Sequence, residues 1–262
     1  MNSRPKKSFG QHFLHEKRYI ERIVGAVAPR ADDFVVEIGP GEGALTLPLL
    51  AAAGRLTAIE LDTDLIPGLQ ARAAAVGELS IVHADVLKVD FTALAHRHGV
   101  ERLRLAGNLP YYISSPILFH CVEHAAAIRD MHFMLQKEVV DRMAAEPGSK
   151  VYGRLSVMLQ LACRVIPLFT VPPGAFRPPP KVDSAVVRLE PLAAHELHDA
   201  DPDRLHAIVK AAFAQRRKTL ANGLRQLLDA EAIRSAGIDP KARAETLAPM
   251  DFVRLAKVPA GA

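Results

Sequence analysis

Over its first two thirds the chain alternates short apolar runs with helix-compatible stretches, a pattern that few folds accommodate. Strands that alternate with helices pair in parallel, because each connecting helix crosses over a face of the sheet. The sequence therefore predicts an α/β domain with a mostly parallel sheet that is covered on both faces. The predicted strands are residues 34–38, 55–60, 79–82, 103–106 and 131–135.

The last third of the chain has a different character. Two further β-like runs, 165–171 and 185–189, flank a proline-rich loop and predict an antiparallel hairpin at one edge of the sheet. Beyond about Pro191 the pattern is helical, with caps and turns and no convincing strand. A chain of 262 residues suits one large domain and one small domain. We therefore expect a Rossmann-like domain over 1–190 and a small helical domain over 191–262.

Composition excludes several classes of protein. No stretch approaches the roughly 20 apolar residues that a bilayer-spanning helix needs, so we expect a cytoplasmic protein without a membrane partner. Cys121 and Cys163 stand alone, with no CxxC motif or Cys/His cluster, so the sequence predicts no metal site. The net charge of +4 is compatible with a polyanionic partner but does not identify one.

A glycine-rich loop, EIGPGEGA at 37–44, closes the first predicted strand and opens a helix. Glycine lets the backbone turn tightly and approach a ligand, because no Cβ stands in the way. Gly39 and Gly41 together with Ala44 also fit a dinucleotide-binding fingerprint. A plain strand–helix turn is a third interpretation, so the loop by itself does not identify the ligand.

Two carboxylates narrow the choice of ligand. Glu60 ends the second predicted strand, where a carboxylate can accept hydrogen bonds from both ribose hydroxyls of an adenosine. Asp85 follows the third strand, where a carboxylate can accept from an adenine amino group. The glycine loop contains no Lys or Arg to neutralise a pyrophosphate. A cationic sulfonium nucleoside suits such a site better, so we expect the cofactor to be S-adenosylmethionine.

The segment NLPY at 108–111 follows the fourth predicted strand. An aromatic amino nitrogen is a poor nucleophile because its lone pair is delocalised into the ring. If the Asn108 side-chain oxygen and the Leu109 carbonyl accept from the amino hydrogens, the lone pair can point at a methyl group. Pro110 favours an extended Leu109, and Tyr111 can stack on the base. A plain proline turn remains the alternative interpretation.

A second unusual segment, FRPPPKVDS, spans 176–184. Its prolines stiffen a loop that begins with an aromatic side chain. Phe176 could therefore form a second stacking wall for the target base. A connection between edge strands with a buried phenylalanine explains the same residues equally well.

Taken together, the motifs resemble those of the bacterial 16S rRNA adenine dimethyltransferases, which are related to the erythromycin-resistance rRNA methyltransferases. One departure is Tyr112, which stands where many relatives have Asn. The matching motifs run from residue 9 to about 220. They are FGQHFL at 9–14, EIGPG at 37–41, NLPY at 108–111, FMLQKE at 133–138, YGRLSV at 152–157, FRPPPKVDS at 176–184 and QRRKTL at 215–220.

The resemblance implies a class I methyltransferase fold that dimethylates N6 of two adjacent adenines. The target would be a hairpin loop near the 3′ end of 16S rRNA, within the assembling small ribosomal subunit. It also implies that Asn108, Tyr111 and Phe176 handle the adenine, and we expect a monomer. By the resemblance and the loop pattern, the predicted cofactor-binding residues are His12, Leu14, Gly39, Gly41, Glu60, Asp85 and Asn108.

A stretch without Asp or Glu, 204–225, predicts where RNA binds. If it forms one helix, four of its cations share a face. A solvated amphipathic helix is the usual explanation for such a pattern, but an acid-free face this long also suits phosphate contacts. A basic N-terminal segment, 4–7, is either a second contact or a solubilising tail. The predicted RNA-binding residues are Lys210, Arg216, Arg217, Lys218 and Arg225.

Two functions of other classes remain open at the level of sequence. A nicotinamide-dependent oxidoreductase would need only the glycine loop and Glu60, but it leaves Asp85 and the loop at 108–111 without a role. A non-catalytic RNA-binding assembly factor could keep the fold, and substitution of Asn108 would then have no effect on methylation.

Overall fold

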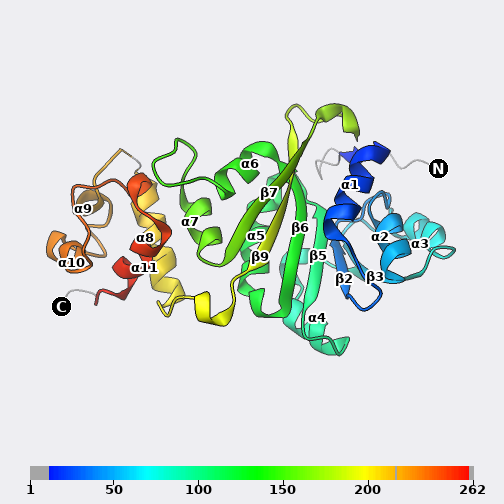
Figure 1. The fold of residues 1–262 in the computed structure, drawn as a ribbon, viewed down its shortest axis with the longest axis horizontal. Helices are drawn as coiled ribbons and strands as arrows, with labels where there is room; N and C mark the ends of the chain where they lie inside the picture. Colours follow the sequence, from blue (N-terminus) through cyan, green and yellow to red (C-terminus); the bar gives the residue numbers. More distant parts are fainter. Residues whose placement is uncertain (1–11, 216, 260–262) are drawn as a thin grey trace. The chain divides into compact units, whose positions relative to one another are not determined.

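A computed structural model describes residues 12–215 and 217–259 (Figure 1). The predicted N-terminal basic segment and Arg216 therefore lie outside the described residues. The chain divides into two compact units. The first contains the residues up to Val140 together with Ile166–Pro191, and the second contains Asp141–Val165 and Leu192–Ala262.

The first unit is built on a seven-stranded sheet with the order β4-β3-β2-β5-β6-β9-β7. Pairing is parallel from β4 to β6, whereas β9 pairs antiparallel with β6. The two late β-like runs, β7 and β9, are neighbours at one edge, as the sequence predicts. The strands are β2 (Val35–Ile38), β3 (Arg55–Glu60), β4 (Glu78–His83), β5 (Leu103–Asn108), β6 (Ile128–Gln136), β7 (Cys163–Val171) and β9 (Ser184–Pro191).

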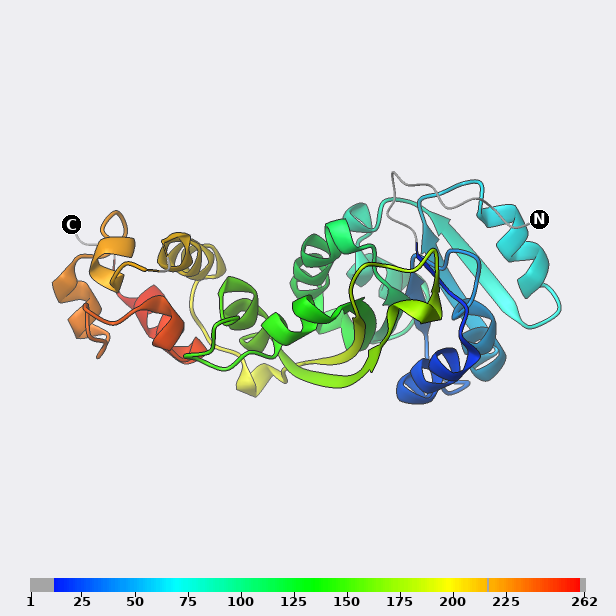
Figure 2. The same cartoon turned by 90° about the horizontal axis from the view of Figure 1, so that it is seen from above.

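Helices flank this sheet on both faces. Figure 2 shows α1 (Lys17–Val27) and α2 (Thr46–Ala53) on one side and α5 (Ser114–Glu123) on the other. Side chains of α1 and α2, such as Ile23 and Leu49, form one core cluster with alternate strand residues. The strand residues between them point to the opposite face, because successive side chains alternate across a strand. The remaining helices that begin in this unit are α3 (Ile66–Ala73), α4 (Phe91–Arg97) and α6 (Lys137–Met143).

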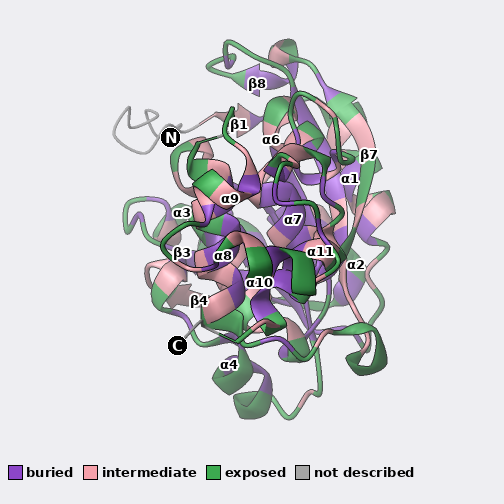
Figure 3. Cartoon of the chain, turned by 90° about the vertical axis from the view of Figure 1, so that its left-hand side faces the viewer, coloured by how far each residue is buried: buried purple, intermediate pink, exposed green. Residues whose placement is uncertain are grey.

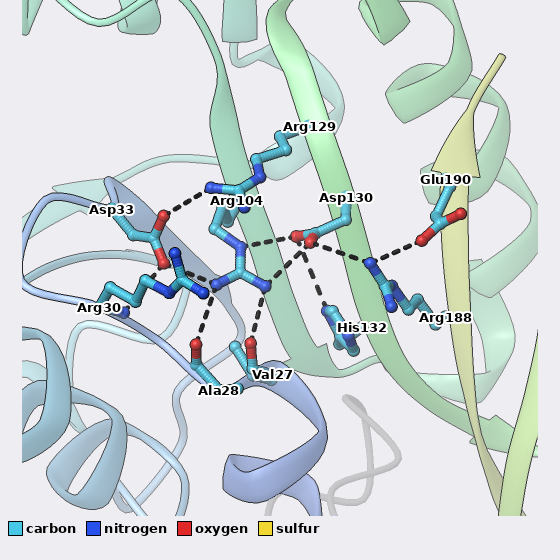
Figure 4. A network of polar contacts seen from close by, with 10 residues as sticks. All are labelled: Val27, Ala28, Arg30, Asp33, Arg104, Arg129, Asp130, His132, Arg188 and Glu190. Atoms are coloured by element: carbon cyan, nitrogen blue, oxygen red, sulfur yellow. Dashed lines mark hydrogen bonds and ion pairs between the residues drawn. The ribbon is translucent and has the colours of Figure 1, made fainter. Parts of the chain in front are cut away.

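A buried ion network holds the amino-terminal ends of the central strands together (Figure 4). The Arg104 guanidinium donates to both carboxylate oxygens of Asp130 at 2.9 Å and to Asp33 at 2.7 Å. It also donates to the Val27 carbonyl at the end of α1, at 2.7 Å. The side chains of all three charged residues are at most 7% exposed. The network therefore joins β5, β6 and α1 at the edge of the sheet that lies opposite the carboxyl ends of the strands.

The second unit is helical and has a core of its own. Residues of α7, α8 and α11, including Val157, Ile208 and Phe252, are buried in one cluster. Figure 3 shows α7 in the colours of buried and intermediate residues, and four of its seven residues are buried. The predicted division placed 141–165 in the first domain, but this segment packs with the C-terminal helices because α7 contributes to their core. The helices are α7 (Arg154–Gln160), α8 (Pro202–Ala214), α9 (Leu220–Gly223), α10 (Ala230–Ser235) and α11 (Pro249–Lys257).

The predicted single helix over 204–225 is wrong. α8 ends at Ala214, because Gln215 adopts a non-helical backbone with φ −136° and ψ 73°. The chain then pairs with a distant segment: Leu220 N–H donates to the Ala242 carbonyl, and Thr219 forms a β-bridge with Arg243. These long-range hydrogen bonds replace the helical ones. The cations of this stretch therefore do not share one helical face.

Candidate active site

The predicted site residues converge at the carboxyl ends of the parallel strands. The order of the sheet reverses between β2 and β5, so the connections after these two strands run in opposite directions. Such a switch point opens a crevice, which is where α/β sheets bind ligands. Gly39 follows β2, whereas Glu60 and Asn108 end β3 and β5. The topology thus brings together residues that lie far apart in the sequence.

The glycine turn has a backbone that other residues tolerate poorly. Gly39 and Gly41 have φ values of 68° and 57°, in the left-handed region. A Cβ at Gly107, in the neighbouring strand, would lie 2.4 Å from the Ile38 carbonyl oxygen. Glycine at these positions therefore keeps the turn tight and lets β5 approach β2 closely beside the crevice.

A pocket of about 870 Å³, its open mouth included, occupies this crevice. All its lining residues belong to the first unit. They are His12, Phe13, Ile38, Gly39, Ile59, Glu60, Leu61, Asp62, Ala84, Asp85, Val86, Asn108, Leu109, Pro110, Tyr111, Tyr112, Ile113 and Ile117.

Backbone amides hold the Glu60 carboxylate in place. Oε1 accepts from the N–H groups of Leu61 and Asp62 at 2.9 and 2.8 Å, and Oε2 accepts from Gly41 at 3.3 Å. Burial raises the pKa of Glu60 above its ordinary value, and these amide bonds oppose that rise. Among the described residues Oε2 accepts this one long hydrogen bond, so it keeps room to accept from a ligand hydroxyl.

Two aspartates add to the negative character of the pocket. Asp85 Oδ1 accepts from the Leu87 N–H at 3.0 Å, so the side chain also caps the turn that follows β4. Asp62, which the sequence analysis missed, lines the same pocket and is only 5% exposed. Its position two residues after Glu60, just beyond the end of β3, is the signal that could have revealed it. Three carboxylates thus face one apolar pocket.

The Asn108 amide has a fixed orientation. Its Nδ2 donates to the His12 carbonyl at 3.1 Å. A carbonyl can only accept, so the amide nitrogen must lie on the side of His12, and Oδ1 lies on the other side as an acceptor. His12 is held in turn, because its Nδ1 makes a 2.7 Å hydrogen bond with the Pro178 carbonyl.

The rest of the loop is anchored by the backbone. The Leu109 N–H donates to the Met134 carbonyl of β6 at 3.1 Å. Pro110 has extended torsions, φ −60° and ψ 129°, and precedes a short 3₁₀ turn. The sequence predicts that the Leu109 carbonyl accepts a hydrogen bond from the amino group of the base. This carbonyl therefore belongs to a residue whose own N–H is bonded to the sheet.

The two adjacent tyrosines occupy different environments. Tyr111 is half-buried, and its ring stacks on that of His12 with centroids 5.6 Å apart. The Tyr111 hydroxyl lies 2.8 Å from Ser184 Oγ. Tyr112 is 56% exposed, although it also lines the pocket. Tyr111 is thus the tyrosine that the surrounding structure holds in place.

Three predicted residues do not line the pocket. Phe176 is 2% exposed and packs in the core, which agrees with the interpretation as a buried phenylalanine and not with a stacking wall. It lies in β8 (Phe176–Arg177), which pairs with β1 (Phe13–Leu14), so pairing with β1 fixes its position. Leu14 is buried in the same cluster, whereas its neighbour Phe13 lines the pocket. Gly41 acts through its N–H on Glu60.

A further buried carboxyl is that of Glu37 in β2, which is 1% exposed. Burial raises its pKa from 4.5 to about 7, and the Glu60 charge adds to the rise. The folded chain keeps this proton between about pH 4.5 and 7, whereas the unfolded chain releases it. Stability therefore decreases as the pH rises through this window.

We expect Glu37→Gln to remove this pH dependence. The variant should unfold at the same urea concentration as the wild type at pH 4.5, and at a higher one at pH 8. The difference in unfolding free energy at pH 8 should reach on the order of 3 kcal/mol, since one pKa unit corresponds to about 1.4 kcal/mol. Glu78→Gln, at an exposed position of β4, is the control. An equal midpoint for Glu37→Gln and wild type at pH 8 would contradict the assignment.

The predicted RNA-binding cations lie in the second unit, apart from Arg216, which is outside the described residues. Lys210, Arg217, Lys218 and Arg225 are all exposed. The bridge between Thr219 and Arg243 places the exposed Lys241 and Arg243 beside the segment that follows α8. These two residues could not be predicted from the sequence, because only the fold brings 241–243 next to 217–221.

Two searches of the described residues give negative results. No described helix is long and apolar enough to cross a membrane. Within the same residues, no group of three His, Cys, Asp or Glu side chains could hold a metal ion.

Comparison with known proteins identifies the family. Residues 2–260 match the family model for ribosomal RNA adenine dimethylase. A protein of Xanthomonas oryzae pv. oryzae named ribosomal RNA small subunit methyltransferase A is 62% identical over 253 residues, covering 97% of this chain and 95% of that protein. A protein of the same name from Xanthomonas campestris pv. campestris is 61% identical, with the same coverage.

Solved structures agree in fold over almost the whole chain. A dimethyladenosine transferase from Plasmodium falciparum has a TM-score of 0.79 at 25% identity, covering 93% of this chain and 96% of that one. The 23S rRNA methyltransferase ErmE has a TM-score of 0.72 at 29% identity, covering 93% and 97%. The chain therefore belongs to the ribosomal RNA adenine dimethylase family, a family of class I methyltransferases whose methyl donor is S-adenosylmethionine.

Proposed function

We propose that this protein transfers methyl groups from S-adenosylmethionine to N6 of two adjacent adenosines in a hairpin loop near the 3′ end of 16S rRNA. The reaction takes place in the cytoplasm during late assembly of the small ribosomal subunit. The observation that carries the proposal is the Asn108–Tyr111 loop, whose acceptor side chain lines a pocket with three carboxylates. Family membership supports the choice of ribosomal RNA and of adenine.

The pocket suits S-adenosylmethionine in charge and shape. Its lining includes the apolar side chains of Ile38, Ile59 and Ile117, and its polar side chains include Glu60, Asp62 and Asp85. Carboxylates favour a cationic sulfonium over an anionic pyrophosphate. Glu60 would accept from the ribose hydroxyls, and Asp85 from the adenine amino group of the cofactor. When bound, the cofactor supplies an activated methyl group on sulfur.

The loop residues act on the target nitrogen. Asn108 Oδ1 and the Leu109 carbonyl accept hydrogen bonds from the two amino hydrogens, which draws the N6 lone pair out of conjugation with the ring. After methyl transfer the nitrogen releases one proton to water. Tyr111 stacks on the base and holds it, a contact worth about 1–3 kcal/mol. Positioning of this kind accounts for the rate without a general base, since the acceptors orient the nucleophile before reaction. An adenine in a paired stem would first have to be flipped out of the stack.

Methyl transfer by the purified protein tests the proposal. Small subunits from cells that lack the modification are incubated with S-adenosylmethionine, and the rRNA nucleosides are separated. We expect N6,N6-dimethyladenosine at two adjacent positions. Absence of any methylated adenosine with wild-type protein would reject the proposal.

The cofactor can be tested separately from the RNA. We expect S-adenosylmethionine to raise the melting temperature, whereas NAD should not. Stabilisation by NAD alone would favour the oxidoreductase that the glycine loop and Glu60 also permit. We also propose that the protein acts as a monomer.

We also propose that exposed cations of the second unit bind the rRNA phosphates. The surface consists of Lys210 in α8, exposed cations of the acid-free segment after α8, and the 241–243 segment, which the Thr219–Arg243 bridge joins to the segment after α8. Its exposed lysine and arginine side chains would contact the phosphates of the RNA backbone. Such contacts do not recognise the base sequence. The residues of this surface are Lys210, Arg217, Lys218, Arg225, Lys241 and Arg243.

Neutralising this surface should weaken RNA binding through salt-dependent contacts. We expect Arg217→Gln combined with Lys218→Gln to lower the slope of log affinity against log salt by about 1.5, since each phosphate contact contributes about 0.7–0.9. Affinity for S-adenosylmethionine should not change, because the pocket lies in the first unit. Arg97→Gln, at an exposed position of α4, is the control. An unchanged salt slope in the double variant would contradict this assignment.

A further inference from the structure

Ser184 occupies a rigid position outside the pocket. It is the first residue of β9 and pairs with Gln136 of β6 in the sheet register. The neighbouring Lys137 N–H donates to the Asp183 carbonyl at 2.9 Å, which fixes the strand at this end. The side chain is fully buried and does not line the pocket. Ser184 therefore cannot touch a ligand directly.

The Ser184 hydroxyl nevertheless reaches the active-site loop. Its Oγ lies 2.8 Å from the hydroxyl of Tyr111, a separation of 73 residues in sequence. Burial raises the pKa of Tyr111, so the phenol stays protonated at neutral pH and can share this hydrogen bond. The backbone of Tyr111 is held as well, since its carbonyl accepts from Ser114 Oγ at 3.1 Å.

The same segment of chain holds the partner of the tyrosine ring. His12 stacks on Tyr111, and its Nδ1 bonds to the carbonyl of Pro178, six residues before Ser184. The segment 176–184 thus fixes both rings of the stacked pair, one by a carbonyl and the other by a hydroxyl. Without the Ser184 hydroxyl, the Tyr111 ring would lose its hydrogen bond and keep the stacking contact with His12 and the backbone anchor to Ser114.

We infer that Ser184 is a positioning residue for methyl transfer, because its hydroxyl fixes the Tyr111 ring in the orientation that receives the target adenine. The inference rests on the proposed function, since it concerns how that site holds its base. Loss of the hydroxyl lets the ring move before the base arrives, so ordering the ring becomes part of RNA binding. Ser184 is not among the residues that line the pocket with Glu60 and Asp85, so we expect cofactor binding to be unaffected.

A double-mutant cycle tests this link. Ser184→Ala, Tyr111→Phe and the combined variant are compared with wild type in methyl transfer to small subunits lacking the modification. Each single variant should lower kcat/KM for the RNA about 3- to 10-fold, the size of one neutral hydrogen bond. The combined variant should lose no more than either single one, since both remove the same bond. KM for S-adenosylmethionine should remain within about twofold of wild type, as a ring-positioning role requires.

Two serine controls separate positioning from general destabilisation. Ser80→Ala lies on exposed β4, and Ser156→Ala removes a buried hydroxyl that donates to the Arg142 carbonyl in the second unit. Neither control variant should lower kcat/KM for the RNA without also changing KM for S-adenosylmethionine. If Ser184→Ala does not fold, Tyr111→Phe alone decides, and full activity of that variant overturns the inference.

The outcomes distinguish this inference from the function on which it rests. Additive losses in the combined variant, or wild-type kcat/KM in Ser184→Ala, overturn the positioning role while the wild type still methylates rRNA. A parallel loss of cofactor binding in Ser184→Ala also overturns it, because the effect would then be general to the fold. If the wild type fails to methylate any adenosine, the proposed function itself is rejected.

Discussion

Replacing Asn108 by alanine is expected to lower kcat for methyl transfer by about 10²-fold or more, the cost of losing one preorganised group at the reacting centre. The variant loses the Oδ1 acceptor, so the N6 lone pair of the bound adenine stays conjugated with its ring. It also loses the 3.1 Å hydrogen bond from Nδ2 to the His12 carbonyl. Binding of the small subunit should persist, because the proposed phosphate contacts lie in the second unit.

Initial rates with saturating S-adenosylmethionine and subunits measure this effect. Asn222→Ala, at an exposed position of α9, is the matched control and should keep wild-type rates. A non-catalytic assembly factor predicts the opposite, namely that Asn108→Ala changes nothing. Methylation by Asn108→Ala at more than about a third of the wild-type rate would contradict the role of the amide acceptor.

The second large effect is expected at Arg104, at the opposite edge of the sheet. Arg104→Met leaves the carboxylates of Asp33 and Asp130 buried and without the guanidinium that joins them (Figure 4). Removing one partner of a buried ion pair costs about 3–5 kcal/mol, because the remaining charge is uncompensated. We expect the unfolding free energy to fall by that amount in urea denaturation followed by circular dichroism.

Arg102→Met is the control for this substitution. Arg102 is exposed and lies two residues before Arg104, so its replacement should change stability by less than about 0.5 kcal/mol. A loss below about 1 kcal/mol in Arg104→Met would show that the network contributes little. Part of the loss should be recovered in Arg104→Met combined with Asp130→Asn, since that variant buries one charge fewer.

The strands of the first unit could be predicted because burial on both faces leaves a strong local signal. Predicted strand 55–60 coincides with β3, and the others differ from the observed bounds by a few residues at most. Since parallel strands end at one edge, placing Glu60 and Asn108 at strand ends was enough to predict that they meet. The alternation of strands and helices in the sequence was therefore enough to predict most of the arrangement of the pocket residues.

Features that depend on contacts between distant segments could not be predicted. Phe176 follows three residues of a short turn and looks like a loop aromatic, but pairing of β8 with β1 buries it. The stretch after Ala214 contains no helix breaker before Asn222 and Gly223, yet hydrogen bonds to 240–243 end α8 early. The contacts of His12 with Asn108 and of Ser184 with Tyr111 likewise span 96 and 73 residues.

Mass spectrometry of small-subunit rRNA from cells that lack this protein tests the central claim most directly. The proposed function predicts that two adjacent adenosines near the 3′ end lose their N6 methyl groups. Wild-type protein supplied from a plasmid should restore them, whereas Asn108→Ala should not. Dimethyladenosines that persist in the deletion strain, or that return with Asn108→Ala, would contradict the proposal that this chain is the methyltransferase for that site.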